Sequence, residues 1–380
     1  MNSKERVMVA VEHKRPDRVP VGEMGIDHDH VSRILGHHTY WRNRKDTTLA
    51  FWDGRRDEVV ESMKEDYAEL VEKLDFDLIA VELVPPKGFL VEDVPIKTSE
   101  NIWENRKGEI YRYAASNDSI QCVHRALEKD ELTEADIDRA MERALHIDDS
   151  VFEVLDYFCD RYGKERAIVF RSVDVYSFLF EPFGGDFQHQ LMLTAMAPEE
   201  ILRMHEACLL YNQALVEHCR KKGVTIMMQP QDFGISTGPM FNMETFRTLF
   251  APLMKKINDD TVAYGMLPFF HCCGNIWKLM DDYVACGYQG YQSIQETATM
   301  DNRRVKELYG DRLTLWTGIQ CETLVAGTME ETEDEVLKNL DILMPGGGFL
   351  FGSTNSVQYG ARTDNYLKAL EVVREKGIYR

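Results

Sequence analysis

The segment PFFHCCGNIWKLMDDYVACGYQGYQSIQE, residues 268–296, predicts the fold class most clearly. Its two ends, 268–273 and 290–296, are short apolar runs of the kind that form buried β-strands. The segment between them, NIWKLMDDYVACG, has the mixed apolar and acidic pattern of an amphipathic helix. A strand, a helix and a second strand of this kind predict a βαβ unit with parallel strands.

The same alternation runs along most of the chain. Strand-like runs also occur at 18–23, 77–83, 167–172, 225–232, 313–320 and 347–353. Helical patterns lie between them, including 57–74 and 198–223, and the second opens with proline and acids and ends in Lys-Lys-Gly. Eight strand candidates, mostly followed by helices, predict a (β/α)8 TIM barrel. A doubly wound sheet is less favoured, because no glycine-rich phosphate loop follows the first strand.

Two segments do not fit the barrel pattern. Residues 30–56 are rich in Trp, Arg and His, and residues 84–150 carry no barrel-like alternation. We therefore predict one barrel domain over residues 1–380, with an N-terminal extension and insertions around the early strands, 30–56 and 84–150 being peripheral.

Composition restricts the class of protein. The 380 residues carry a net charge of −20, which argues against nucleic acid and anionic membranes as partners. No run of about 18 apolar residues and no signal-peptide pattern is present, so we expect a cytoplasmic protein. Eight cysteines without framework spacing are typical of reduced thiols, and Cys208 and Cys219 lie in a helical pattern as core residues.

Polar residues follow the predicted strands where a barrel places its chemistry, at the C-terminal ends. In strand order these residues are Glu23, Arg171, Asp232, His271 with Cys273, Glu296, Cys321 and Ser353. We expect them to converge on one rim.

His271 and Cys273 are the strongest candidates for a metal site. Side chains alternate along a strand, so these two point to one side and Cys272 points to the other. Zinc takes imidazole and thiolate ligands, and Glu296 and Cys321 end the next two strands. The alternative is a core histidine beside buried free thiols. A second group, His28, His30, His37 and His38, is more typical of a solvated loop or a helix start than of a metal site.

Four stretches resemble the uroporphyrinogen decarboxylase superfamily in its methyltransferase-type branch. They are SKERVMVAVEHKRPDRVPV (3–21), QDFGISTGPMFNMETFRTLFAPLMKKI (231–257), residues 270–336 and residues 346–380. The resemblance is to methylcobamide:coenzyme M methyltransferases and, more distantly, to cobalamin-independent methionine synthase. It is weak from about residue 30 to 165.

The resemblance implies a (β/α)8 barrel and a zinc site. Family methyltransferases bind zinc through an H-x-C pair on strand five, often a Glu on strand six, and a Cys on strand eight. His271, Cys273 and Glu296 match the first three positions. Ser353 or Thr354 stands at the fourth, so we predict that Cys321, one strand earlier, substitutes for it.

The remaining roles are assigned to polar residues of the predicted rim. Asp232 and Glu296 are the expected catalytic residues, and Glu23, Arg171 and Asp232 are expected to hold a small-molecule substrate. The alternatives are a structural acid that caps the loop after the fourth strand for Asp232, and rim salt bridges for Glu23 and Arg171. The arginine motif with which the decarboxylases hold tetrapyrrole propionates is missing. Glu23, Asp27 and Asp29 stand there instead and would repel carboxylates.

The predicted function is a zinc-dependent methyltransferase that moves a methyl group between a corrinoid, or a methylated small molecule, and a thiol or similar acceptor. A corrinoid protein is the expected partner, and a homodimer is the expected assembly. The alternatives are a metal-free decarboxylase of the uroporphyrinogen decarboxylase type and a non-catalytic barrel that binds a corrinoid or a partner protein.

Overall fold

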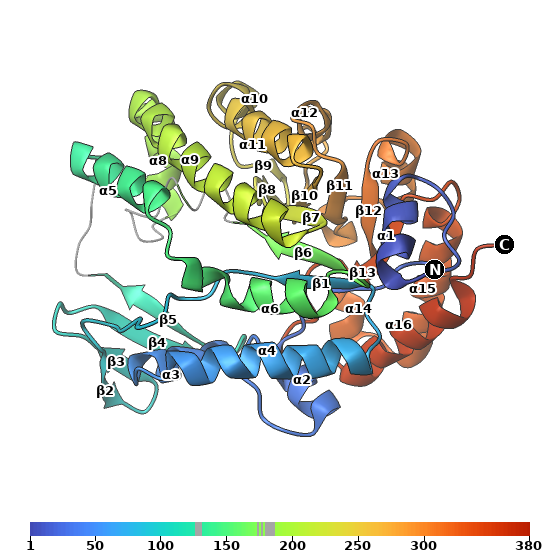
Figure 1. Cartoon of the computed structure of the whole chain (residues 1–380), viewed down its shortest axis with the longest axis horizontal. Helices are drawn as coiled ribbons and strands as arrows, with labels where there is room; N and C mark the ends of the chain where they lie inside the picture. The colour runs from blue at the N-terminus through green and yellow to red at the C-terminus, as the bar shows by residue number, and fades with distance from the viewer. Residues whose placement is uncertain (126–130, 173–174, 176–177, 179–186) are drawn as a thin grey trace.

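The computed structural model describes residues 1–125, 131–172, 175, 178 and 187–380. Within these ranges, a curled parallel sheet of seven strands forms the centre of the molecule, in the order β1-β6-β7-β10-β11-β12-β13 (Figure 1). The strands are β1 (Leu78–Val81), β6 (Ala167–Arg171), β7 (Ile226–Pro230), β10 (Leu267–Cys272), β11 (Gly290–Ser293), β12 (Thr314–Ile319) and β13 (Phe349–Ser353). All neighbouring strands run parallel, so their C-terminal ends share one edge.

The predicted first strand, 18–23, makes isolated bridges and no regular strand. It still contacts both edges of the sheet. On one side Phe351 N–H donates to the Pro20 carbonyl at 2.8 Å, and on the other Asp77 N–H donates to the Val21 carbonyl at 2.7 Å. Pro20 has no N–H to continue a ladder. The α/β prediction is therefore confirmed as a curled parallel sheet of seven strands. The described residues form no regular eighth strand, so the (β/α)8 barrel itself is not confirmed.

A buried carboxylate fastens this seam. The side chain of Asp77 is fully buried at the start of β1. It accepts hydrogen bonds from Arg6 Nη1 and Arg18 Nη1, both at 2.7 Å, and from the Val21 backbone N–H at 2.8 Å. The N-terminal segment is thus tied to the sheet through one acid.

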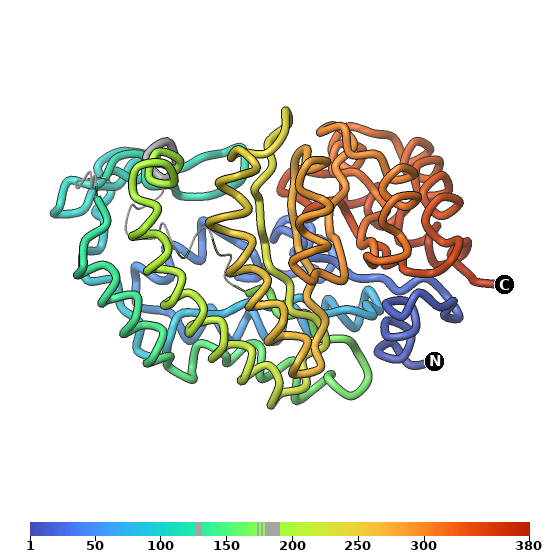
Figure 2. The backbone as a smooth tube through the Cα atoms, turned by 90° about the horizontal axis from the view of Figure 1, so that it is seen from above, coloured from blue at the N-terminus to red at the C-terminus, as the bar shows by residue number. Residues whose placement is uncertain are grey.

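Helices cover the outer face of the sheet (Figures 1 and 2). They include α4 (Arg56–Lys73), α6 (Glu153–Tyr162), α9 (Pro198–Lys222), α11 (Ala251–Ala263), α12 (Met280–Ala285), α13 (Asn302–Tyr309), α15 (Met329–Leu343) and α16 (Thr363–Lys376). Helix α1 (Ser3–Val11) instead packs Val7 and Ala10 against the apolar residues inside the curled sheet. The other helical elements are α5 (Glu134–Leu145), η1 (Asp149–Phe152), α8 (Phe187–Met196), α10 (Met243–Thr245), η3 (Phe246–Phe250), η4 (Glu296–Ala298) and α14 (Cys321–Ala326). None of the described helices is both long and apolar enough to cross a membrane.

The predicted peripheral segments have structure of their own. Residues 30–56 contain most of α2 (His28–Leu35) and all of α3 (Arg44–Trp52). Residues 84–150 contain an antiparallel sheet, with β2 (Ile96–Ser99), β3 (Ile102–Glu104), β4 (Ile110–Ala114) and β5 (Ser119–His124). This sheet lies beside α3, on the side of the molecule opposite the C-terminal helices (Figure 1). A two-stranded ribbon, β8 (Gly234–Ile235) and β9 (Gly238–Pro239), follows β7.

Two apolar layers hold the fold together. One fills the inside of the curled sheet and includes Leu78, Met228, Phe269, Trp316 and Leu350. The other lies between the sheet and the surrounding helices. Because both faces of the seven strands of the curled sheet are buried, most of these strands are rich in apolar residues, and this explains why they could be predicted. Strand β11 also carries Gln292 and Ser293.

Candidate functional site

Three potential metal ligands meet at the C-terminal ends of β7 and β10. Asp232 follows β7, His271 is the penultimate residue of β10, and Cys273 comes directly after that strand. His271 Nε2 lies 3.3 Å from Cys273 Sγ and 3.8 Å from Asp232 Oδ1. One ligand atom from each residue lies within 4.8 Å of the others, and the described ranges contain no second group of this kind. We refer to these three residues as the cluster.

The ring of His271 is oriented by a residue that the sequence analysis did not identify. Its Nδ1 bonds to Oε1 of Gln292, which is paired with His271 across β10 and β11. The Gln292 amide nitrogen donates to the Ser353 carbonyl at 2.9 Å. A carbonyl only accepts, so the Gln292 oxygen must face His271, and Nδ1 must carry the proton. Nε2 is then left with its lone pair directed at the cluster.

The spacing of the cluster fits a zinc ion. Tetrahedral zinc, with bonds of about 2.0–2.3 Å to N, S and O, holds neighbouring ligand atoms about 3.4–3.6 Å apart. The observed separations of 3.3 and 3.8 Å lie close to that range. A carboxylate, an imidazole and a thiolate are each zinc ligands, and catalytic zinc sites combine three protein ligands with a fourth position left for water or substrate.

Electrostatics at His271 favour a positive charge. Burial lowers the pKa of this imidazole, but the neighbouring Cys273 and Asp232 raise it more, and the resulting pKa is about 9. A metal ion that binds Nε2 would displace the proton that gives the imidazole its positive charge, because histidine binds metals in its neutral form.

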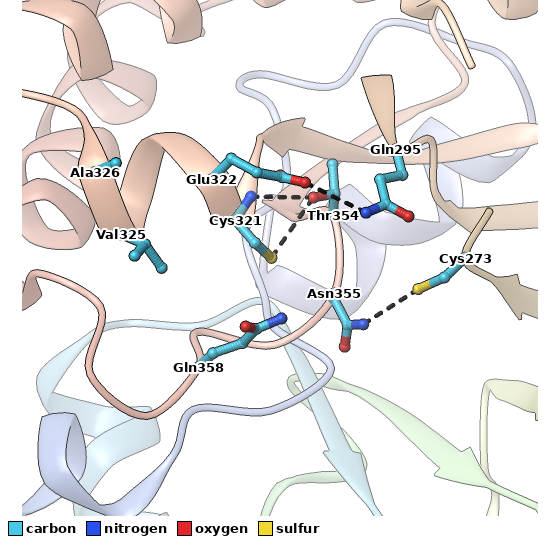
Figure 3. Close-up of a pocket in the computed structure, with 9 residues that line it drawn as sticks. All are labelled: Cys273, Gln295, Cys321, Glu322, Val325, Ala326, Thr354, Asn355 and Gln358. Atoms are coloured by element: carbon cyan, nitrogen blue, oxygen red, sulfur yellow. Dashed lines mark hydrogen bonds between the residues drawn. The ribbon is translucent and has the colours of Figure 1, made fainter. Parts of the chain in front are cut away.

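Cys273 is half-buried and receives polar contacts. Asn355 Nδ2 donates to its sulfur at 3.2 Å, and the two side chains face each other in Figure 3. Asp232 Oδ1 accepts from the Cys273 backbone N–H at 2.7 Å. Cys272 is fully buried on the opposite side, and burial raises the pKa of its thiol. The predicted alternation along this strand is confirmed.

Two of the predicted metal ligands lie outside the cluster. β11 ends at Ser293, so Glu296 falls in the following helix η4, where its carboxylate lies 3.4 Å from Lys338 Nζ. Cys321 is the first residue of α14, and its sulfur contacts Thr354 Oγ1 at 3.6 Å (Figure 3). Burial raises the pKa of the Cys321 thiol to about 12.

The backbone beside the cluster is strained. Ser293 has φ 126° and Ile294 has φ 65°, a region in which a β-branched residue is rarely found. Strain of this kind costs about 1–3 kcal/mol per residue and is concentrated at functional sites. It lies where β11 turns away from His271.

Two cavities open beside the cluster. The first, which we call the polar cavity, has a volume of about 580 Å³ and is lined by Asp232, His271, Arg171 and Arg44, among others. The second, which we call the cysteine cavity, has a volume of about 410 Å³ and is lined by Cys273 and Cys321 (Figure 3). Asn355 and Gln358 line both, so the two cavities meet at the loop after β13.

Arg171 and Glu23 occupy different surroundings. Arg171 lines the polar cavity and pairs with Glu82 at 2.9 Å, while its buried Nε has no hydrogen-bond partner in the described part of the chain. Glu23 is buried and lines neither cavity. Its carboxyl accepts from the Ser353 N–H at 3.0 Å and from Ser353 Oγ at 2.6 Å, and burial raises its pKa to about 8.

The four histidines of the early segment do not form a metal site. His28 and His30 lie in the first turn of α2, which confirms the predicted helix start. Each ring faces a different partner: Asp118 for His28, Thr363 for His30, Glu69 for His37 and Asp46 for His38.

Comparison with known proteins places the chain in a family. The family model described as uroporphyrinogen decarboxylase (URO-D) matches residues 174–376, which is more than half of the chain. No curated protein sequence matches it significantly.

Among solved structures, a methyltransferase from Methanosarcina mazei is similar in fold. Its TM-score is 0.64 at 17% identity, covering 99% of both chains. A sugar phosphate isomerase/epimerase from Parabacteroides distasonis reaches a TM-score of 0.36 at 8% identity, covering 88% of this chain and 96% of its own. The family match and the shared fold agree, and the chain belongs to the uroporphyrinogen decarboxylase family.

Proposed function

We propose that this protein is a zinc-dependent methyltransferase that moves a methyl group between a corrinoid, or a methylated small molecule, and a thiol or similar acceptor. Membership of the URO-D family and the fold shared with the Methanosarcina mazei methyltransferase support this proposal. The observation that carries it is the cluster, in which the ligand atoms of Asp232, His271 and Cys273 have separations suited to one zinc ion.

The chain's own residues prepare the site. Gln292 keeps the Nδ1 proton of His271 in place, so that Nε2 is free to bind a metal. Asn355 donates to Cys273 and stabilises negative charge on its sulfur. Asp232 is fixed on one side by the Cys273 N–H, and its side chain remains 57% exposed toward the cavity. A zinc ion held here supplies a positive charge that lowers the pKa of an acceptor thiol and favours the thiolate.

The polar cavity is the proposed substrate site. Arg171 and Arg44 lie in the same cavity as His271, and Arg171 is paired there with Glu82, another residue of the cavity lining, at 2.9 Å. We assign Arg171 to an anionic or polar end of the substrate, and Asp232 to the metal end. Glu23 is too deeply buried to touch substrate. Its carboxyl accepts from the Ser353 N–H, and the Ser353 carbonyl accepts from the Gln292 amide, so Glu23 helps to hold Gln292 in place.

Several further assignments belong to the same proposal. The methyl donor would approach through the cysteine cavity, which reaches Cys273 from the other side of Asn355. Four further points stay predictions. They are the corrinoid partner protein, the cytoplasmic location, the homodimer and the single domain with peripheral segments 30–56 and 84–150. Glu296 and Cys321 are assigned no metal contact, because their side chains face Lys338 and Thr354.

One observation favours the decarboxylase alternative. The sequence suggested that acids near the N-terminus would repel substrate carboxylates. In the structure Asp27 is paired with Arg42 at 2.8 Å, and the raised pKa of Glu23 leaves that buried group neutral below about pH 8. With Arg42, Arg44 and Arg171 lining the polar cavity, a carboxylated substrate is not repelled as strongly as expected.

Two assays on the same purified protein, one for methyl transfer and one for porphyrinogen decarboxylation, separate the two functions. Purified protein, loaded with zinc or stripped with a chelator, is mixed with free methylcobalamin and a small thiol, and loss of the methylcobalamin absorbance is followed. We expect zinc-dependent turnover that is lost in Cys273→Ser and kept in Cys272→Ser. Porphyrinogen decarboxylation that is insensitive to chelator, with no methyl transfer, would replace this proposal with the alternative.

A further inference from the structure

The lining of the polar cavity includes part of the antiparallel sheet. Ser116 and Asn117, in the turn between β4 and β5, line the same cavity as Asp232 and His271. This turn belongs to the segment with the weakest resemblance to the family. The parallel sheet therefore supplies the cluster, while the antiparallel sheet supplies another part of the cavity lining.

Asn117 has a hydrogen-bond donor to offer. Its side-chain oxygen accepts from Ser119 Oγ at 2.8 Å, which leaves the amide nitrogen as the free end. Within the described ranges this nitrogen has no hydrogen-bond partner, and the residue is only half-buried. An amide nitrogen carries two hydrogens, so the turn presents an unused donor at the cavity.

The turn is held in place by the next residue. Asp118 is buried, with φ 45°, and its carboxylate accepts from Tyr113 Oη at 2.6 Å. His28 Nε2 lies 2.8 Å from the same carboxylate, and Lys45 Nζ lies 3.8 Å from it. The Lys45 backbone N–H also donates to the Asp118 carbonyl at 3.1 Å.

These contacts join the turn to the rest of the cavity. Lys45 belongs to α3 and His28 to α2, so Asp118 links the antiparallel sheet to both helices of the early segment. His28 also stacks on Tyr359, with ring centroids 5.6 Å apart, and Tyr359 lines the polar cavity. A turn anchored from three sides is rigid enough to select among ligands.

We propose that Asn117 determines substrate specificity, by donating its amide N–H to an oxygen acceptor at the end of the substrate remote from the cluster. Asp118 is a positioning residue that holds Asn117 at the cavity. The preferred ligands are small thiols that also carry a carboxylate or similar oxygen group, since Arg44 and Arg171 share the cavity. This inference rests on the proposed function, because it takes the sulfur end to be bound at the cluster.

The test uses full-length protein loaded with cobalt in place of zinc, whose thiolate absorption reports the binding of a thiol. Two probes of similar shape are titrated, mercaptopropionate with an oxygen acceptor and propanethiol without one. Asn117→Ala is expected to weaken the binding affinity for mercaptopropionate by about 10-fold or more, because a hydrogen bond to a charged group is lost. The affinity for propanethiol should change less than about 2-fold. Asn101→Ala, in the exposed turn between β2 and β3, is the matched control and should change neither.

Asp118 is tested beside it. Asp118→Ala should also weaken the binding affinity for mercaptopropionate and leave the cobalt affinity unchanged. Asp118→Asn, which can still accept a hydrogen bond from Tyr113, should recover part of the mercaptopropionate affinity. Equal mercaptopropionate affinity in wild type and Asn117→Ala would overturn the inference and leave the proposed function standing. Failure of cobalt-loaded wild type to bind either thiol would overturn both.

Discussion

Gln292 offers the sharpest test of how the cluster is organised. It is buried between two groups that need it, accepting from His271 Nδ1 and donating to the Ser353 carbonyl. Gln292→Leu keeps the volume approximately and removes both hydrogen bonds. Loss of the residue that orients a histidine ligand typically lowers metal affinity 10–100-fold, or about 1.4–2.7 kcal/mol.

The same change also leaves a donor and an acceptor buried without partners. Each such group costs about 1–3 kcal/mol, so the metal-free protein should lose roughly 2–6 kcal/mol of unfolding free energy. Zinc affinity is measured by competition with a chromogenic chelator, and stability by urea unfolding. Both are measured below pH 8, where Glu23 stays neutral.

A matched variant separates the two effects. Gln229, also buried, lies on the neighbouring strand β7. Its side chain donates to Asn258 at 2.7 Å and accepts from Tyr288 Oη at 2.7 Å and from Gln231 Nε2 at 3.1 Å. Gln229→Leu should therefore lose at least as much stability as Gln292→Leu and keep its zinc affinity. Unchanged zinc affinity in Gln292→Leu, or an equal loss in both variants, would refute the claim that Gln292 sets the tautomer of His271.

Two further predictions concern the buried acids. The pKa of Glu23 is raised from an ordinary 4.5 to about 8 in the folded protein. Between these two values the folded protein holds a proton that the unfolded chain releases. The contribution of this group to the unfolding free energy is therefore full below pH 4.5 and is lost as the pH rises toward 8. Urea unfolding from pH 5 to 8 should therefore show wild type losing about 1.4 kcal/mol per pH unit relative to Glu23→Gln, and parallel pH profiles would contradict this. Asp77→Asn should lower the unfolding free energy by about 3–5 kcal/mol, because Arg6 and Arg18 lose their buried partner, and a loss below 1 kcal/mol in thermal or urea unfolding would show that the seam does not depend on it.

The seven strands were predictable because each is short and buried and most are rich in apolar residues, although β11 carries Gln292 and Ser293. The exception, 18–23, contains Pro20 and makes only isolated bridges, and its hydrogen bonds to β1 and β13 depend on the three-dimensional closure of the sheet. The apolar residues of that segment predicted a strand, but the sequence pattern could not show whether a regular ladder of hydrogen bonds would form.

The site was predictable only where strand geometry continued. His271 and Cys273 are two apart at the end of one strand, and the period of two placed them correctly. Glu296 and Cys321 stand two or three residues beyond the ends of β11 and β12, where the chain has already turned into a helix and the period no longer applies. Asp232, past the end of β7, was expected on the same rim as a catalytic and substrate-binding residue, but its place as a third possible metal ligand was not predicted.

The supporting residues were missed for a different reason. Gln292 reaches His271 through the pairing register of two strands, which a single sequence does not contain. Its signal was a glutamine inside an otherwise buried strand, where an amide has to find partners. Asn117 lies in a loop, whose course depends on tertiary contacts.

The central claim is that Asp232, His271 and Cys273 hold one metal ion. It is tested most directly by titrating the metal-free protein with cobalt and following the thiolate-to-metal absorption in wild type, Cys273→Ser, Cys272→Ser and Cys321→Ser. We predict one ion per chain in wild type, loss of the absorption in Cys273→Ser, and wild-type spectra and affinities in the other two. A wild-type protein that takes up no metal, or a Cys273→Ser variant with an unchanged spectrum, would contradict it.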